Sequence, residues 1–192
     1  FAMSQKISAL SLGDAALKKI GIRKGLPETE DQALVYLFMA SSSLSGDDYE
    51  KLLDDFIRQF PANADGYLRR ANYYAAKGKD DQTWYDKAVA DFNQALKVAQ
   101  KKDDVYYNIG KLMYAYQLSK PEKTYKDWTY DTALQNVRQA IAIDPLPIYI
   151  QMEGDILFAQ QDYAGALAAY YSKGRENDKV EIDYIQKKNI RS

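Results

Sequence analysis

Four pairs of adjacent aspartates are the residues of this sequence best suited by type to acid–base or metal chemistry. They are Asp47-Asp48, Asp54-Asp55, Asp80-Asp81 and Asp103-Asp104. Two neighbouring carboxylates can divide the roles of general acid and general base, or hold a hard divalent cation. None of the pairs has the alternating acidic spacing of a calcium-binding loop. Three of them stand where a helix is expected to begin, and acidic side chains stabilise that end of a helix. We therefore predict a structural role for them and no metal site.

Composition limits the remaining catalytic chemistry. The sequence has no cysteine and no histidine, which removes thiolate nucleophiles, cysteine metal sites and the commonest general base. It also lacks glycine-rich phosphate loops, and no serine has the neighbours of a nucleophile elbow or of a serine–lysine pair. We expect no catalytic residues and no cofactor, and hence a protein that is not an enzyme.

The two tryptophans, Trp84 and Trp128, are the most specific indication of a ligand. Each lies just before a segment with helical periodicity, and tyrosines stand close to both in sequence, Tyr85 beside the first and Tyr125 and Tyr130 beside the second. One interpretation is an aromatic platform for a peptide or a sugar ring. The simpler interpretation, which we favour, is that each indole covers the start of the helix that follows it.

Charge and hydropathy argue against two classes of partner. The chain has 26 Lys and Arg against 27 Asp and Glu, a formal charge of −1, so it has no strong electrostatic attraction to nucleic acid or anionic lipid. No apolar run approaches the ~20 residues that a membrane-spanning helix needs. We therefore expect no nucleic-acid partner and no transmembrane segment.

The segments that must position these residues have the 3.6-residue periodicity of amphipathic helices. One phrase, an aromatic residue followed by a small or aliphatic and then a large residue, occurs four times. The copies are Tyr49–Leu52–Phe56, Tyr85–Ala88–Phe92, Tyr130–Ala133–Val137 and Tyr163–Ala166–Tyr170, spaced by 36, 45 and 33 residues. Partner helices are expected before them at about 28–44, 65–77, 103–118 and 147–160. Self-similarity at such a period predicts stacked helical repeats.

At these positions the sequence resembles the tetratricopeptide repeat family, whose units carry a small residue in the first helix and an alanine in the second. The clearest match reads Tyr106-x2-Ile109-Gly110-x2-Met113, followed by Ala133-x3-Val137 and then Pro145. The second and fourth units follow the same pattern, and the first is the most degenerate. Two units are longer between their helices, by 5 and 11 residues. The resemblance implies an all-α fold, a right-handed α-solenoid of antiparallel helix pairs.

The implied organisation is about four units over residues 28–175, divided as 28–63, 64–102, 103–145 and 146–175. Residues 1–27 are expected to form an N-terminal helix that caps the array or belongs to a preceding repeat. Residues 176–192 are expected to form a C-terminal helix that caps it or begins a further repeat. Because the end of a repeat array exposes an apolar face, self-association through the solenoid ends is a further expectation.

In proteins of this family the first helices line a concave face, and the resemblance implies that a protein or peptide partner binds there. The residues placed on that face are Leu68, Arg69, Asn72, Tyr107, Asn108, Lys111, Tyr114, Gln151, Asp155 and Phe158. The expected function is therefore that of a non-enzymatic interaction or scaffold module.

One branch of the family binds the C-terminal carboxylate of its partners through two lysines, two asparagines and an arginine. In this sequence Asn72 and Asn108 occupy the two asparagine positions, whereas Leu68, Ile148 and Met152 occupy those of the cations. A carboxylate placed there would be desolvated and unpaired, which is costly. The sequence therefore predicts that this protein does not bind such tails.

The alternative function is a glycan-binding or glycan-uptake component of a bacterial cell envelope, with the loops around Trp84 and Trp128 as the sugar platform. The repeats, degenerate and rich in Tyr, Lys and Asp, resemble those of bacterial envelope proteins. This resemblance favours the periplasm or cell envelope over the cytoplasm. The identity of the partner is left open.

Overall fold

The computed structural model describes residues 26–172, apart from residues 43, 45, 79–80 and 124, together with residue 187. The helices expected over residues 1–27 and 176–192 therefore lie outside the described residues, except for residues 26–27 and 187. Within the described part the regular structure is entirely α-helical. No helix there is both long enough and apolar enough to cross a bilayer.

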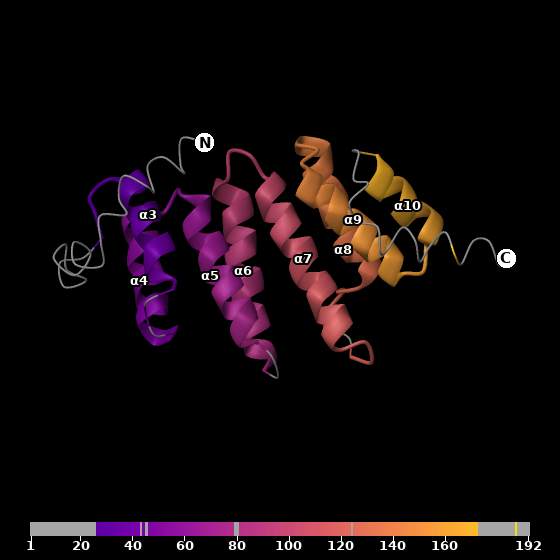
Figure 1. The fold of residues 1–192 in the computed structure, drawn as a ribbon. Coiled ribbons are helices and arrows are strands. Elements are labelled where there is room, and N and C mark those ends of the chain that lie inside the picture. Colours follow the sequence, from indigo (N-terminus) through magenta and orange to yellow (C-terminus); the bar gives the residue numbers. More distant parts are fainter. Residues whose placement is uncertain are drawn as a thin grey trace.

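Eight helices occupy the described part and pack as four consecutive pairs. Their bounds are α3 Glu30–Ala40, α4 Gly46–Gln59, α5 Ala64–Lys77, α6 Gln82–Val98, α7 Asp103–Ser119, α8 Tyr130–Ile143, α9 Pro147–Ala159 and α10 Tyr163–Tyr171. Figure 1 shows the pairs side by side, from α3 and α4 at one end to α9 and α10 at the other. Each second helix contacts the first helix of the next pair, and α7 contacts both α5 and α9. This packing is consistent with the expected helical repeat.

Polar side chains close the starts of several helices. Asp81 Oδ1 accepts a hydrogen bond from the Thr83 N–H at 2.9 Å, and Asp162 Oδ1 accepts one from the Gly165 N–H at 2.9 Å. Thr129 forms a capping box with Thr132 at the start of α8. Each of these bonds satisfies an N–H group that has no partner inside the helix.

The aspartate pairs have structural surroundings in the described part of the chain. One pair lies in the first turn of α4 and another in the first turn of α7, and Asp81 caps α6. Asp54 and Asp55, inside α4, accept hydrogen bonds from Arg70 and Arg58. Among the described residues, no group of three or more acidic side chains is placed to hold a metal ion.

Close approach between the two helices of a pair depends on small residues. A Cβ added to Gly110 of α7 would lie 2.8 Å from the carbonyl oxygen of Ala133 and 2.8 Å from the Val137 side chain, both on α8. Gly154 of α9 faces the buried ring of Tyr170 on α10 in the same way. Glycine therefore allows each first helix to lie directly against its partner.

Partly buried ion pairs and hydrogen bonds connect helices within a pair and between neighbouring pairs. Arg70 donates from Nε and Nη2 to the two carboxylate oxygens of Asp91, each at 2.7 Å, and from Nη1 to Asp54 at 2.7 Å. Bonding to Asp91, itself 5% exposed, raises the pKa of Arg70 above its ordinary value. The fully buried Tyr149 hydroxyl donates to Asp104 at 2.8 Å and to Asp103 at 3.2 Å. These bonds join α5 to α4 and α6, and α9 to α7.

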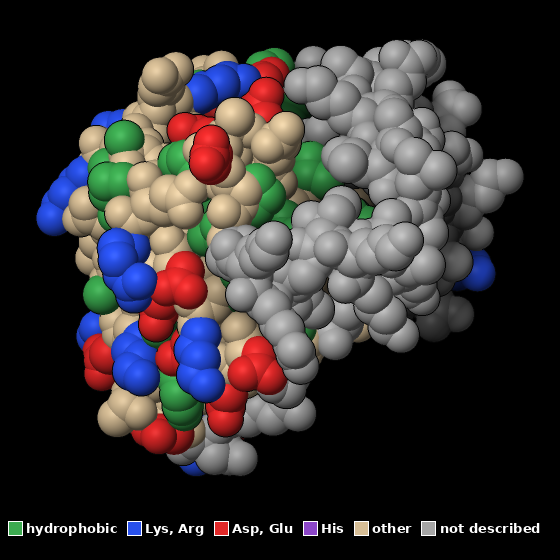
Figure 2. All heavy atoms as spheres, turned by 90° about the vertical axis from the view of Figure 1, so that its left-hand side faces the viewer, with side chains coloured by type: hydrophobic (Ala, Val, Ile, Leu, Met, Phe, Trp, Pro, Cys, Tyr) green, Lys and Arg blue, Asp and Glu red, His purple; other side chains and the backbone are tan. Residues whose placement is uncertain are grey.

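Salt bridges on the outer surface connect oppositely charged side chains. Figure 2 looks at the α3–α4 end of the molecule and shows basic and acidic side chains interspersed among the described residues that are visible there. On α4, Arg58 and Asp55 pair at 2.7 Å, with both side chains more than half exposed. Exposed pairs of this kind contribute little to stability, typically about 0–1 kcal/mol. The fold therefore depends on its core and its buried polar contacts.

We expect Gly110→Ala to destabilise the protein by about 1–3 kcal/mol, because the added methyl group overlaps a backbone carbonyl that cannot move without shifting α8. The sign of the stability change is informative, because helix propensity alone would make alanine more stabilising than glycine by ~1 kcal/mol. Urea unfolding followed by circular dichroism measures the change.

Gln135→Ala, an exposed substitution on the same helix pair, is the control and should change the unfolding free energy by less than ~0.5 kcal/mol. A Gly110→Ala protein as stable as the wild type, or more stable, would contradict the close packing of α7 on α8.

Candidate functional site

The first helices α5, α7 and α9 present a row of polar and aromatic side chains, which we call the first-helix face. Asn72 Nδ2 on α5 donates to Asn108 Oδ1 on α7 at 3.1 Å, and Asn108 Nδ2 donates to the Asp104 carbonyl oxygen at 2.7 Å. Farther along α7, the Tyr114 hydroxyl donates to the Asp155 carbonyl oxygen of α9 at 3.4 Å. Hydrogen bonds between side chains and backbone thus connect all three helices across this face.

Most of the residues predicted for this face are accessible on it. Asn72 and Lys111 are exposed, and Arg69, Asn108, Tyr114, Gln151, Asp155 and Phe158 are half-buried. Asp155 also accepts a hydrogen bond from the Tyr170 hydroxyl at 2.8 Å, and the Phe158 ring packs edge-on against Tyr163. The α9 part of the face is therefore tied to α10, while the α5 and α7 parts carry its exposed amide and ammonium groups.

Two residues predicted for the face do not line it. Leu68 is 7% exposed and packs in a core cluster with Val105 and neighbouring residues. Tyr107 is 9% exposed, and its ring lies 4.8 Å from that of Tyr149 on α9. One step along a helix turns the side chain by about 100°, so residues next to the face turn into the contact between units instead.

A pocket of about 420 Å³ lies at the α5 end of the first-helix face, and we call it the Arg69 pocket. It is lined by Ser41, Leu44, Gly46, Tyr49, Arg69, Asn72 and Tyr73. Its origin is the short first helix of the first unit. Asn63 Nδ2, at the cap of α5, donates to Glu30 at the start of α3 at 2.5 Å, so the two helices begin together. Because α3 ends at Ala40 while α5 continues to Lys77, a hollow lies beside α5, lined on this side by Ser41, Leu44 and Gly46.

Arg69 and Arg70, although adjacent on α5, have opposite surroundings. Arg70 forms three hydrogen bonds to Asp91 and Asp54. The Arg69 Nε atom is buried and has no hydrogen-bond acceptor among the described residues, nor does Arg69 form an ion pair with any described carboxylate. Buried polar atoms without a partner are rare in folded proteins. Among the described residues, Arg69 Nε is therefore the buried side-chain donor that lacks an acceptor.

Sequence reasoning found Arg69 and Asn72 but missed the rest of the pocket. Ser41, Leu44 and Tyr49 come from the first unit, whose match to the repeat pattern is the weakest. A turn signal at Ser45-Gly46 was present in the sequence, but it does not tell how α3 and α5 align. The pocket wall depends on that alignment.

Burial, together with the nearby negative charge of Asp155, raises the pKa of Tyr114 to about 12. The phenol is therefore a hydrogen-bond donor, and not a base, throughout the neutral range. Burial also raises the pKa of Tyr107. The tyrosines of this region thus act as neutral polar or packing groups.

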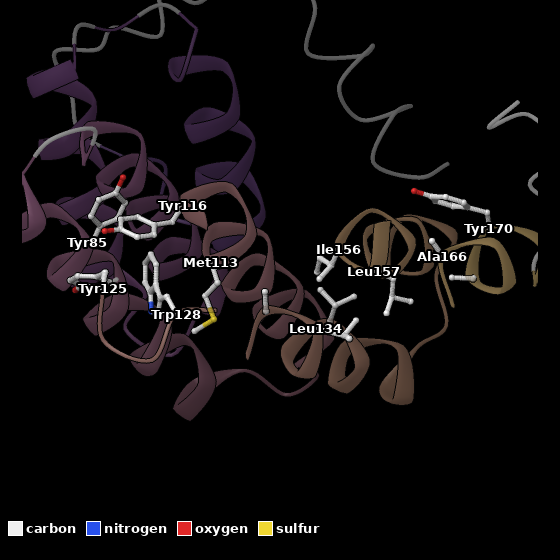
Figure 3. Packing of buried hydrophobic residues seen from close by; sticks show 13 residues of the cluster. Tyr85, Met113, Tyr116, Tyr125, Trp128, Leu134, Ile156, Leu157, Ala166 and Tyr170 are labelled. Atoms are coloured by element: carbon white, nitrogen blue, oxygen red, sulfur yellow. The ribbon is translucent and has the colours of Figure 1, made fainter. Parts of the chain in front are cut away.

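Trp128 cannot serve as a platform for a ligand, because it is 3% exposed. Its ring centroid lies 4.6 Å from that of Tyr125, 5.4 Å from Tyr116 and 5.6 Å from Tyr85, all nearly perpendicular to it (Figure 3). Gln117 Nε2 donates to its carbonyl oxygen at 2.6 Å. The described part of the connection between α7 and α8 is therefore anchored to α6 and α7 through Trp128, which is a packing residue.

Trp84 is half-buried, and cations already lie over its ring. The Lys87 Nζ lies 4.2 Å and the Lys77 Nζ 4.6 Å from a ring centroid of Trp84, and the Tyr74 ring is 5.7 Å away. Such cation–π contacts stabilise the junction of α5 and α6. A sugar ring stacked on Trp84 would have to replace these lysines.

A second hollow, of about 230 Å³, lies where α6, α7 and α8 meet the connection before α8. Apolar side chains line much of it, among them Val89 and Leu96 of α6 and Ile109 and Leu112 of α7. Sequence reasoning did not anticipate it, although the 11-residue insertion in this unit was a signal. Asn93, an exposed residue of α6, stands at its edge.

No protein-family model matches the chain, and no match is found among the curated proteins. The geometry of the described residues is therefore the basis for a proposed function.

The two tryptophans should differ in accessibility. We expect the Trp84→Phe protein, which reports only Trp128, to show blue-shifted emission and acrylamide quenching several-fold weaker than the Trp128→Phe protein, because three tyrosine rings enclose Trp128. In high urea the two proteins should quench equally. Equal quenching without urea would contradict the burial of Trp128.

The late ionisation of Tyr114 should be visible on alkaline titration. The difference in absorbance at 295 nm between the wild type and Tyr114→Phe should have its midpoint near pH 12 rather than 10, because burial disfavours the phenolate. Since the folded pKa lies above the unfolded value, the contribution to stability is complete below about pH 10 and is lost as the pH rises towards 12.

Tyr114→Phe should therefore lose less stability than the wild type between these two pH values. As a control, the same difference titration in urea should return to a midpoint of about 10. A midpoint near 10 in the folded protein would show that Tyr114 is not buried as described.

Proposed function

We propose that this chain is a non-enzymatic interaction module of the tetratricopeptide type, a right-handed α-solenoid that binds a peptide segment of a partner protein along its first-helix face. The observation that carries the proposal is the continuity of this face. Its helices contact one another across units, and a row of hydrogen-bonding side chains crosses from α5 to α7 and α9.

The α5 and α7 parts of the face have the chemistry to hold a peptide backbone. An asparagine amide has two donor hydrogens and an acceptor oxygen with two lone pairs. Asn72 uses one hydrogen to reach Asn108, and retains its second hydrogen and its oxygen. Asn108 receives that bond and donates to the Asp104 carbonyl, so the side chain is held in place. A preorganised amide of this kind can bind an extended peptide without first losing rotamer freedom.

The charges of the face favour a partner with acidic residues. Arg69 and Lys111 form no ion pair with a carboxylate of the described residues, whereas Asp155 is engaged by Tyr170. The cations therefore remain available for a ligand over α5 and α7. Complementary charge of this kind increases the association rate and specificity more than the affinity.

The other chemically notable groups of the described part are engaged in contacts within the fold. Asp91 is held by Arg70, and Asp103 and Asp104 accept from Tyr149, while Lys101 pairs with Asp103 and Asp144. The burial of Trp128 and the lysines over Trp84 leave no observation that favours the glycan-binding alternative. Peptide binding along the first helices is the function that the geometry supports best.

The test is selection from a phage-displayed library of random dodecapeptides, followed by fluorescence-polarisation titration of the selected peptides. Asn72→Ala with Lys111→Glu changes two exposed residues of the first-helix face and should weaken binding at least about tenfold, ~1.4 kcal/mol. Asn93→Ala with Lys97→Glu makes the same two changes at exposed positions of α6 and should leave binding within about twofold.

Failure of the wild type to select any peptide would refute the proposal. Loss of binding in the α6 variant alone would move the binding site to the hollow beside Asn93. Circular dichroism of both variants checks that each remains helical.

A further inference from the structure

We propose that the Arg69 pocket is a subsite for one carboxylate side chain, an aspartate or a glutamate, of the peptide bound along the first-helix face. This inference rests on the proposed function and deepens it. It assigns a chemical preference to one position of the ligand, and it assigns Arg69 as the residue that recognises it.

The guanidinium of Arg69 lacks an acceptor for its buried Nε–H among the described residues. The Arg69 Nε atom is buried in the pocket wall without an acceptor among the described residues, one residue away from Arg70, whose three hydrogen bonds satisfy it. A buried donor on a charged group is costly until an acceptor meets it. A ligand that brings a carboxylate would supply that acceptor.

The acidic side chains near Arg69 do not supply this missing acceptor. At the start of α4, Glu50 pairs with Lys77 at 3.0 Å, and Asp47 lies 3.6 Å from the same ammonium group. Asp65 stands one turn before Arg69 on α5, yet the two form no ion pair. The pocket thus retains a positive charge that the described part of the chain does not neutralise.

The charge of the pocket suits one carboxylate group. A single guanidinium matches a single carboxylate, which it can hold through two parallel hydrogen bonds. Two of the hydroxyls that line the pocket already donate elsewhere, Ser41 to the Phe38 carbonyl and Tyr73 to the Gly46 carbonyl, each at 2.7 Å. A phosphate, with a charge of about −1.5 to −2, would meet only one guanidinium cation among the residues that line the pocket.

The wall of the Arg69 pocket has an apolar surface. Leu44 and the rings of Tyr49 and Tyr73, which meet edge-on at 5.9 Å, provide an apolar surface beside the guanidinium. The methylene groups of an acidic side chain can pack there while its carboxylate reaches Arg69. A volume of about 420 Å³ accommodates such a side chain.

The Arg69 pocket is connected to the rest of the first-helix face through Asn72. Asn72 lines the pocket and also donates to Asn108 on α7. A peptide held by these asparagines would therefore pass the mouth of the pocket. The acid-binding position is thus part of the same binding track and not a separate anion site.

The experiment begins with the peptides that the wild type selects from the random dodecapeptide library, synthesised with amidated C-termini. We expect their alignment to share one acidic position. Replacing that acid by its amide should weaken binding to the wild type about tenfold. The same replacement should change binding to the Arg69→Gln protein by less than about twofold, because the charged partner is already removed.

Two further variants separate charge, geometry and general surface effects. Arg69→Lys keeps the charge but loses the planar fork, so it should retain part of the preference for the acid. Arg58→Gln removes an exposed arginine of α4 and should keep the full tenfold preference. Circular dichroism confirms folding, and the replacement made in the peptide gives a result that does not depend on protein stability.

Each outcome decides between the pocket and the function as a whole. If the wild type selects no peptide, both proposals fail. If peptides bind and the Asn72→Ala with Lys111→Glu protein loses them, but no acidic position is shared, or Arg69→Gln retains the preference, the pocket assignment fails alone. Affinity that depends on a free C-terminal carboxylate, or competition by millimolar inorganic phosphate, would also overturn the assignment to an acidic side chain.

Discussion

In the described part of the chain, the apolar side of each of the first three helix pairs packs against the pair that follows it. Val105 of α7 lies in the cluster built around Tyr67, Ala71 and Phe92 of the preceding pair. The largest cluster continues from Tyr85 on α6 to Tyr170 on α10, through residues of every helix between them. A single pair would expose this surface to water, so the units are stable only when stacked. The remaining features of the fold follow from that requirement.

Stacking decides which positions accept polar residues. Arg70 on α5 and Glu153 on α9 lie directly before the small residues Ala71 and Gly154. Both side chains are half-buried, Arg70 against α6 and Glu153 against α8. Each is balanced there, Arg70 by Asp91 and Glu153 by Arg138 at 2.7 Å. A charge left unpaired in such a place would be strongly destabilising. Arg69, rotated away from this contact, meets no such partner among the described residues, and the proposed carboxylate subsite rests on this difference.

The aromatic residues of the chain mainly strengthen the contacts between units. Trp128 and three tyrosines hold the connection before α8 against α6 and α7, and the Tyr125 hydroxyl donates to Asp86 at 2.7 Å (Figure 3). A tyrosine suits this place because its ring can be buried while its hydroxyl reaches a polar partner. The connection before α8 is thus packed against the fold through Tyr125 and Trp128.

The sequence by itself determined the helices, their pairing and the small residues between them, because periodicity and glycine or alanine positions are local consequences of helix geometry. It also identified Asn72, Asn108 and Lys111 as accessible residues. It placed Leu68 and Tyr107 wrongly, since a rotation of one residue decides between the open face and the contact with the next unit. Only the tertiary structure decided the Arg69 pocket and the burial of Trp128. Both depend on how segments far apart in sequence align, as α3 does with α5, and no local pattern of residues encodes that alignment.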